Sequence, residues 1–192
     1  MRFIRDGVRG HAWFMLSLPA LLAAALLASP QARASDGTIT ITGQVTANTC
    51  TINAGGTSSA NATLVLPTVS TAALSTVGSK AGATPLTISF SGCSTGLTGA
   101  TVYFEASGIE DFTSGCLSNT ATVSASNVEA CVSNLDGSSV LLGKPSGSQG
   151  VKTATLTGGS GSQTFLVAYY AANAAATAGA FSSQVTYSVI YQ

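Results

Sequence analysis

The side chains that could perform acid–base chemistry are few in this sequence and poorly placed for it. Its one histidine is His11, close to the amino terminus. Glu105 precedes Glu110 and Asp111, and paired carboxylates are the machinery of glycoside hydrolysis. Solvated charges at strand ends are the other interpretation, and with six acidic residues after position 34 we favour it. We therefore expect no catalytic residues and predict that the protein is not an enzyme.

The cysteines could bind a metal or form disulfides. A structural zinc site favours two cysteines separated by a short spacer, and no Cys-x-x-Cys sequence or nearby histidine is present. An even number of cysteines in an exported chain is typical of disulfides, and four cysteines can pair in three ways. We therefore predict disulfides, an oxidising compartment, and neither a metal nor a cofactor. The residues concerned are Cys50, Cys93, Cys116 and Cys131.

Residues 1–34 have the pattern of a cleaved signal peptide. Basic residues precede an apolar run over 13–28, and Ala32-Arg33-Ala34 supplies the small-x-small sequence before a cleavage point. A membrane anchor is the competing interpretation, but Pro19 interrupts the run and the cleavage pattern follows it directly. The mature chain, residues 35–192, carries three lysines and six acidic residues, a formal charge of 3 − 6 = −3. This balance predicts no binding of nucleic acid and no direct membrane insertion.

Alternation of apolar and polar residues, typical of half-buried β-strands, recurs along the mature chain. Segments rich in glycine, serine and asparagine separate these stretches, and no stretch has leucine, lysine, glutamate or arginine at helical spacing. The predicted fold is therefore a single all-β sandwich. The expected strands cover 38–47, 64–66, 86–90, 102–104, 140–142, 151–156, 165–169 and 185–191.

Two further motifs are better explained by structure than by binding. The glycine-rich sequence 158–161 lacks the strand-to-helix context and the lysine of a phosphate-binding loop, so we predict a hairpin loop there. Tyr169 and Tyr170 could form an aromatic platform for a sugar. Because neighbouring residues of a strand point to opposite faces, we favour core packing for this pair.

Four stretches together resemble the chaperone–usher pilins, in particular the major-subunit family of type 1 fimbriae. They are residues 37–50 (GTITITGQVTANTC), 64–78, 86–93 (LTISFSGC) and 185–192 (VTYSVIYQ). The resemblance rests on the alternating strand after the signal peptide, on Cys50 and Cys93, and on the penultimate Tyr191. It implies an incomplete immunoglobulin-like β-sandwich that lacks its last strand and leaves a hydrophobic groove beside its C-terminal strand.

The resemblance also implies how the protein functions. In that family a periplasmic chaperone fills the groove, and at the outer-membrane usher the amino-terminal extension of the next subunit replaces it. The chain would then be a structural subunit of a cell-surface fimbria that supports adhesion, with chaperone, usher and neighbouring pilin subunits as partners. A minor adaptor or tip pilin, or a glycan-binding module of the same system, is the alternative. The implied division is a signal peptide (1–34), a donor-strand extension (35–49) and a pilin domain (50–192).

Site residues follow from the same resemblance. The donor face alternates along the extension, and a glycine meets a shallow part of the groove; its residues are Ile39, Ile41, Gly43, Val45 and Ala47. The strand beside the groove ends in a carboxylate that the chaperone grips; its residues are Val185, Tyr187, Val189, Tyr191 and Gln192.

The family's bridge corresponds to Cys50 with Cys93. Cys116 and Cys131 depart from the family's single-bridge pattern. We expect these two to pair with each other, and free or intermolecular cysteines are the alternatives.

Overall fold

The computed structural model describes residues 49–192 together with residues 40 and 42. The chain separates into two compact units, residues 1–45 and 46–192, and every described strand belongs to the second. The predicted signal peptide lies outside the described residues, and so do all five donor residues, Ile39, Ile41, Gly43, Val45 and Ala47. Among the described residues, no helix is long and apolar enough to cross a membrane.

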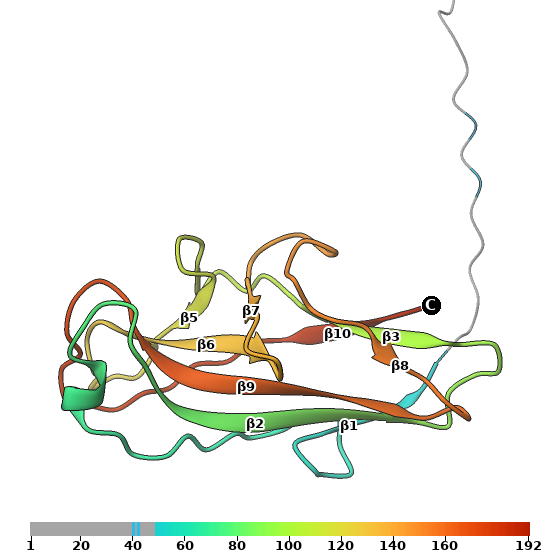
Figure 1. The fold of residues 1–192 in the computed structure, drawn as a ribbon, viewed down its shortest axis with the longest axis horizontal. Helices are drawn as coiled ribbons and strands as arrows, with labels where there is room; N and C mark the ends of the chain where they lie inside the picture. The colour runs from blue at the N-terminus through green and yellow to red at the C-terminus, as the bar shows by residue number, and fades with distance from the viewer. Residues whose placement is uncertain (1–39, 41, 43–48) are drawn as a thin grey trace, which may run out of the picture. The chain divides into compact units, whose positions relative to one another are not determined.

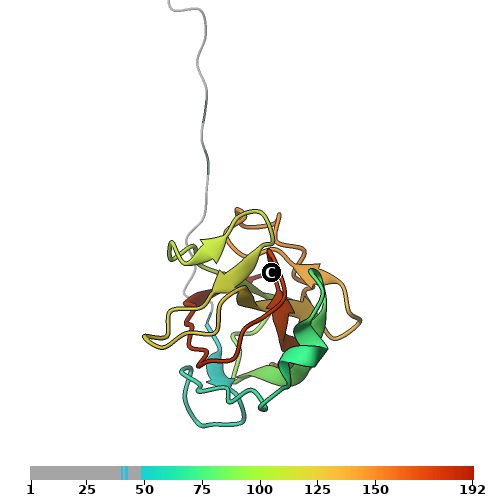
Figure 2. The same cartoon turned by 90° about the vertical axis from the view of Figure 1, so that its left-hand side faces the viewer.

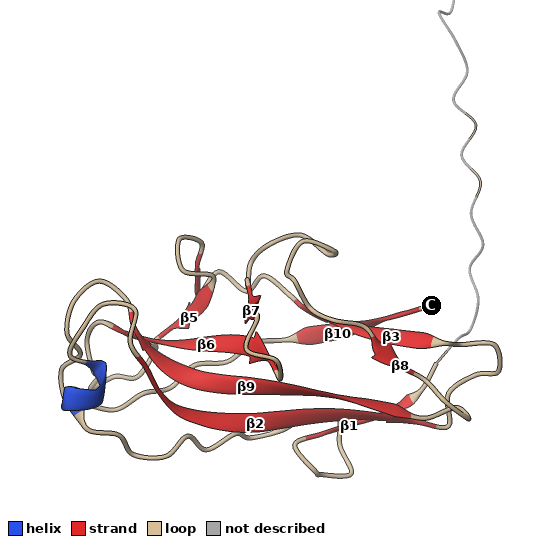
Figure 3. Cartoon of the chain, in the orientation of Figure 1, coloured by secondary structure: helices blue, strands red, loops and turns tan. Residues whose placement is uncertain are grey.

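Strands dominate the second unit, with one short 3₁₀ helix near their start (Figure 1, Figure 3). The helix, η1 (Thr71–Leu74), begins after Ser70, whose side chain accepts a hydrogen bond from the backbone N–H of Ala72. The described strands are β1 (Thr51–Ala54), β2 (Lys80–Ser91), β3 (Gly99–Phe104), β4 (Glu110–Asp111), β5 (Cys116–Ser118), β6 (Val128–Asn134), β7 (Ser139–Val140), β8 (Ala154–Thr155), β9 (Gly161–Ala171) and β10 (Tyr187–Tyr191).

The strands form two antiparallel sheets that enclose one main core (Figure 2). The larger sheet has the order β1-β2-β9-β6-β5-β4, with β7 also paired to β6. The smaller sheet has the order β10-β3-β8. Because side chains alternate across a strand, each sheet directs every second residue at the other sheet. The fold is therefore the all-β sandwich that the alternation predicts.

The centre of the core lies between β3 and β9. Phe104 and Phe165 are 2% and 0% exposed, and their rings meet edge to face with centroids 5.2 Å apart. Edge-to-face packing is a favoured geometry for aromatic pairs, because the ring edge is positive and the face negative. Ile88, Phe90 and Val102 complete this fully buried layer.

Gln149 has a structural role that its sequence context does not reveal. It is 2% exposed, and its side-chain amide bonds the backbone of Phe104 as a neighbouring strand would. The Phe104 N–H donates to Gln149 Oε1 at 3.1 Å, and Gln149 Nε2 donates to the Phe104 carbonyl at 2.6 Å. This amide satisfies two buried backbone groups where β8 no longer accompanies β3.

Several predicted strands are shorter than expected. Strand β7 contains only Val140 of the predicted stretch 140–142, and β8 contains only two residues of the stretch 151–156. The stretch at 64–66 belongs to no strand. Alternation reports which residues face the core, but pairing also needs a partner strand, and these segments border loops or an unpaired edge.

A matched pair of phenylalanines tests the position of the core. We expect Phe104→Ala to lower the free energy of unfolding by about 3–5 kcal/mol, because it removes a fully buried ring and leaves a cavity. Phe112 is 64% exposed, so Phe112→Ala should change stability by no more than about 0.5 kcal/mol. Chemical denaturation of the two purified variants measures both values, and equal losses would contradict the core assignment.

Candidate functional site: the open side of the sandwich

The smaller sheet ends in an edge strand with a free side. Strand β10 pairs with β3 along its whole length, with Tyr187 opposite Phe104 and Tyr191 opposite Ala100. The pairing continues to the carboxyl terminus, where the Gln192 N–H donates to the Gly99 carbonyl at 2.9 Å. Within the described part of the chain, no strand pairs with the other edge of β10. Its outward N–H and C=O groups are therefore available to an added strand.

Side-chain burial changes abruptly between β3 and β10. On the core face of β3, Ala100 and Val102 are 0% exposed. Their neighbours on β10, Tyr191 and Val189, contact the same core cluster but are only partly buried. Neighbouring side chains on the same face of two adjacent strands are in contact and are normally buried to a similar extent. A difference arises when one of the strands has no further strand on its other side. The core is therefore left open beside β10.

A second unpaired segment borders the same core. In residues 62–69 the side chains of Leu64 and Leu66 pack on the core cluster, whereas Val65 between them is 80% exposed. This is the alternation of a strand, yet no backbone hydrogen bond joins residues 62–69 to another described residue. We call β10 and the segment 62–69 together the open side of the sandwich.

The bulge in β2 brings the end of this segment close to the sheet. The pairing of β2 with β9 shifts between Ala81 and Thr84. Gly82 lies in this bulge with a φ of 69°, and a Cβ there would meet Val69 at 3.1 Å and Pro67 at 3.2 Å. A residue without a side chain thus permits both the left-handed backbone and the close packing of 67–69 on β2.

Tyr187 links β10 to the loop that precedes the segment 62–69. Its hydroxyl donates a hydrogen bond to the Ala60 carbonyl at 2.6 Å, across 127 residues of sequence. Burial raises the pKa of Tyr187, and the nearby Tyr191 adds to this effect. The phenol therefore stays neutral and able to donate.

Both disulfides form within the chain. Cys50 bonds Cys93, which ties the residue before β1 to the end of β2, as the resemblance implied. Cys116 bonds Cys131 and joins β5 to β6. All four cysteines are paired, so the free and intermolecular alternatives are wrong.

Of the three carboxylates considered for catalysis, Glu110 is held by hydrogen bonds from the turn that precedes it. Glu110 is 6% exposed, so the expectation of solvated strand-end charges is wrong for this residue. Its oxygens accept hydrogen bonds from Ser107 N–H (2.9 Å), Ser107 Oγ (2.7 Å) and Gly108 N–H (2.8 Å). Burial raises the pKa of Glu110, but these bonds together outweigh it and leave the pKa below its ordinary value. Glu110 thus fastens the turn that leads from β3 to β4.

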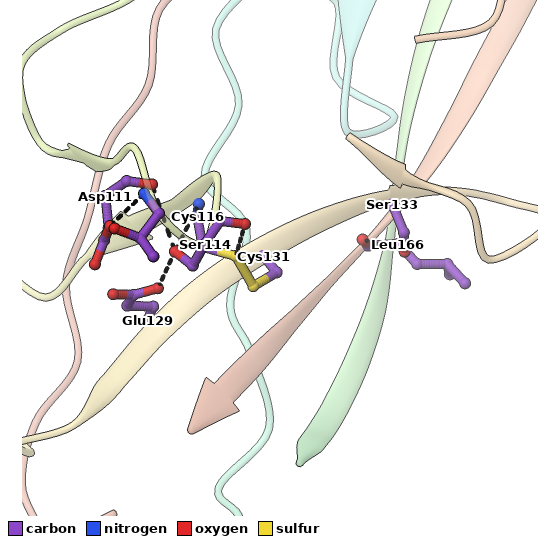
Figure 4. Close-up of a disulfide and its surroundings, with 8 residues drawn as sticks. Asp111, Ser114, Cys116, Glu129, Cys131, Ser133 and Leu166 are labelled. Atoms are coloured by element: carbon purple, nitrogen blue, oxygen red, sulfur yellow. Dashed lines mark hydrogen bonds between the residues drawn. A yellow bond between two sulfur atoms is a disulfide. The ribbon is translucent and has the colours of Figure 1, made fainter. Parts of the chain in front are cut away.

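Glu129 is a buried carboxylate that sequence reasoning passed over. It lies on β6 beside the Cys116–Cys131 bridge and is 6% exposed (Figure 4). Ser114 Oγ donates to Glu129 Oε2 at 2.6 Å. Burial raises the pKa of Glu129 and the charge of Asp111 adds to the rise, whereas the bond from Ser114 opposes it.

Other sequence candidates have structural positions. The predicted hairpin is reduced to a tight turn: Gly158 and Gly159 lie between Thr157 and Ser160, which form an isolated antiparallel bridge. The strands on either side, β8 and β9, belong to different sheets and do not pair with each other. Tyr169 packs edge to face on Phe181 and contacts a small second core cluster, as predicted for one of the two tyrosines. The described residues contain no cluster of side chains suited to a metal ion.

Comparisons with known proteins agree with this geometry. The family profile described as "FimA: Type-1 fimbrial protein, A" matches residues 66–192. The chain is 40% identical over 177 residues to the F17 fimbrial protein of Escherichia coli, covering 90% of this chain and 95% of that protein. It is 41% identical over 179 residues to the major fimbrial subunit SMF-1 of Stenotrophomonas maltophilia strain K279a, covering 89% and 99%. The solved P pilus rod subunit PapA shares the fold, with a TM-score of 0.57 at 19% identity over 74% of this chain and 99% of that one.

The two sheets, the open side and the structural match define the class of this protein as an immunoglobulin-like pilin fold. The chain belongs to the type-1 fimbrial protein A family. This is a family of structural fimbrial subunits and not of enzymes, so the resemblance seen in the sequence is confirmed.

The two buried glutamates should respond to pH in opposite directions. Because the pKa of Glu110 is lowered on folding, its contribution to stability is present above its ordinary pKa and is lost as the pH falls through the folded value. Because the pKa of Glu129 is raised, folding favours its protonated form, and that stabilisation is lost as the pH rises through the folded value. We expect Glu110→Gln to lower the free energy of unfolding at pH 7 by about 1–3 kcal/mol, since it weakens charge-assisted hydrogen bonds.

Glu129→Gln is the matched control, because the amide mimics the neutral acid and can still accept from Ser114. At pH 7 the Glu129→Gln variant should be at least as stable as the unmodified protein. The unmodified protein should gain stability from protonation of Glu129 when the pH is lowered mildly, and the variant should lack this gain. Denaturation curves collected from pH 3 to pH 8 measure both effects. A loss of stability in Glu129→Gln comparable to that of Glu110→Gln would show that Glu129 is held as a charge.

Proposed function

We propose that this chain is a shaft subunit of a type 1-like fimbria, assembled by the chaperone–usher route through donor-strand exchange and displayed on the cell surface. The observation that carries the proposal is a difference in burial between two adjacent strands. On the core-facing side of the smaller sheet, the residues of β3 are fully buried, whereas their neighbours on β10 are only partly buried. An added strand would bond the free edge of β10 and cover the half-buried residues of the open side. A periplasmic chaperone supplies that strand first, and the usher receives the complex.

The strand that replaces the chaperone comes from residues 35–49 of the next subunit. Its alternating residues Ile39, Ile41, Gly43, Val45 and Ala47 match the spacing of the half-buried residues along β10. Burying three of them, Ile39, Ile41 and Val45, at about 1.5–3 kcal/mol each contributes roughly 5–9 kcal/mol. A whole domain has a stability of about 5–15 kcal/mol, so insertion is comparable to folding itself. Polymerisation is then difficult to reverse.

The similarity to the major subunit SMF-1 supports a place in the shaft, where many copies follow one another. The Cys50–Cys93 bridge supports it also, because Cys50 directly follows the extension and fixes it to the end of β2. The mature sequence carries few charges, which suits a subunit whose contacts are made by backbone and apolar groups.

Replacing the central glycine of the extension tests the donor role. We expect Gly43→Phe to abolish polymers and to leave the complex with the chaperone intact, because residue 43 belongs to the donor and not to the acceptor. Immunoblots of surface polymers, together with co-purification of the chaperone, measure the two effects. Loss of the chaperone complex in this variant would defeat the assignment.

Removing the carboxyl-terminal residues tests the acceptor role. Deletion of residues 189–192 removes most of β10 and the terminal carboxylate, so we expect capture by the chaperone to be lost. The measurement is co-purification from the periplasm, with Gly43→Phe as the control that keeps an intact acceptor. If the truncated protein still co-purified with its chaperone, the open side would not be the acceptor.

A further inference from the structure

A cleft lies where β8, at the edge of the smaller sheet away from β10, meets the larger sheet. Three segments line it: the turn 134–136 after β6, residues 152–154, which lead into β8, and residues 162–164 of β9. Its volume is about 420 Å³, within the range of about 300–1,000 Å³ that is usual for small-molecule sites. None of the lining residues belongs to β10 or to the segment 62–69, so this cleft is separate from the open side. We call it the β9 cleft.

Strand β9 has a free edge in this cleft. It pairs with β2 from its first residue, but its pairing with β6 reaches back only to Phe165. In an antiparallel sheet, every second residue directs its N–H and C=O groups toward the same edge. The Leu166 carbonyl faces β6, because it accepts a hydrogen bond from Ser133 Oγ at 3.3 Å. The backbone groups of Ser162 and Thr164 face the same way, toward the cleft, and no described strand pairs with them there.

The cleft also contains a buried acceptor without a donor. Gln163 is 8% exposed, and its Nε2 donates to the Lys152 carbonyl across the junction of the two sheets. No hydrogen bond from a described residue reaches Gln163 Oε1. Buried polar atoms in proteins are nearly always paired, so this exception points to a partner that the chain itself does not supply.

The remaining groups make the cleft neutral and partly apolar. Lys152 and Asp136 form an ion pair in its lining, with side chains 62% and 49% exposed. The hydrogen bond from Lys152 lowers the pKa of Asp136, so both groups stay charged and cancel each other. This balance disfavours a charged ligand. Leu135 is 66% exposed and adds an apolar surface in the same turn as Asp136.

We propose that the β9 cleft binds a neutral saccharide. A hydroxyl both donates and accepts hydrogen bonds, so the hydroxyls of a sugar can pair with the backbone groups of Ser162 and Thr164 and with Gln163 Oε1. The C–H face of a sugar ring can cover Leu135. A peptide strand fits less well, because the free edge of β9 spans only residues 161–164, whereas strands usually have about 5–6 residues.

The fibre multiplies this site. This step rests on the proposed function, in which many copies of the subunit follow one another. A cleft on the surface of one subunit makes few contacts and binds a sugar weakly. Repetition along a polymer lets many weak sites act together and raises the overall affinity by about 10²–10⁴. The shaft then adheres to a glycan-bearing surface along its length.

Purified fibres and sugar-bearing albumins test the site. The probes are albumins that carry galactose, mannose, fucose or N-acetylglucosamine, and a sialylated albumin is the charged comparison. We expect unmodified fibres to retain at least one neutral probe. Leu135→Asp removes the apolar surface and Ser162→Trp fills the cleft, so each should lower binding per subunit at least about tenfold. Val123→Asp, at a position 78% exposed outside the cleft, is the matched control and should bind as the unmodified protein does.

Two results would overturn the inference. One is that unmodified fibres retain no neutral probe, or retain the sialylated probe alone. The other is that both cleft variants bind as well as the unmodified fibre, which would place the saccharide on another part of the fibre. Immunoblots of surface polymers distinguish this failure from failure of the proposed function. If the unmodified chain formed no polymers, the proposed function would be wrong, and the same probes and variants would then test the cleft on the purified subunit.

Discussion

A β-sandwich must satisfy two requirements at every strand: its backbone groups need partners, and its core-facing side chains need cover on both sides. In this subunit both requirements fail at the same place. Strand β10 has a partner in β3 and none among the described residues on its other edge, and its inward side chains are half-exposed where those of β3 are fully buried. The segment 62–69 shares the deficit, since it has the alternation of a strand without its hydrogen bonds. One missing strand accounts for both.

At several other places the side chains of the subunit supply the partners that its backbone groups need. Gln149 replaces a strand partner for Phe104, and Glu110 gathers the N–H groups of the turn after β3. The Cys116–Cys131 bridge and the bond from Ser114 to Glu129 fasten β5 and its preceding turn to β6. In the proposed fibre, the opening beside β10 is the part of the sandwich that a strand of another subunit covers. A subunit closed in this way can be rigid over most of its surface and still be incomplete.

The sequence predicts the parts of this structure that depend on periodicity. Strands β2, β3, β9 and β10 lie where alternation placed them, because side-chain period reports directly which residues face the core. Pairing is a different matter: Leu64 and Leu66 alternate as a strand does, yet whether a partner lies beside them is settled by residues far away in the chain. The same limit hid the bond between Tyr187 and Ala60. Glu110 and Gln149 were missed for another reason, since their burial depends on turn conformations that supply partners and leave no pattern in the sequence.

The position of the Cys50–Cys93 bridge determines how a fibre of such subunits carries mechanical tension. In the proposed fibre, a pull on the amino-terminal extension reaches the folded unit at Cys50, next to a strand of only four residues. Without the bridge, the force would peel β1 from β2 one residue pair at a time. The covalent bond instead delivers the load to the end of β2, a strand of twelve residues that is paired with β9 over most of its length. Breaking the hydrogen bonds between β1 and β2 is then not enough to separate the extension from β2, because the covalent bond still joins them.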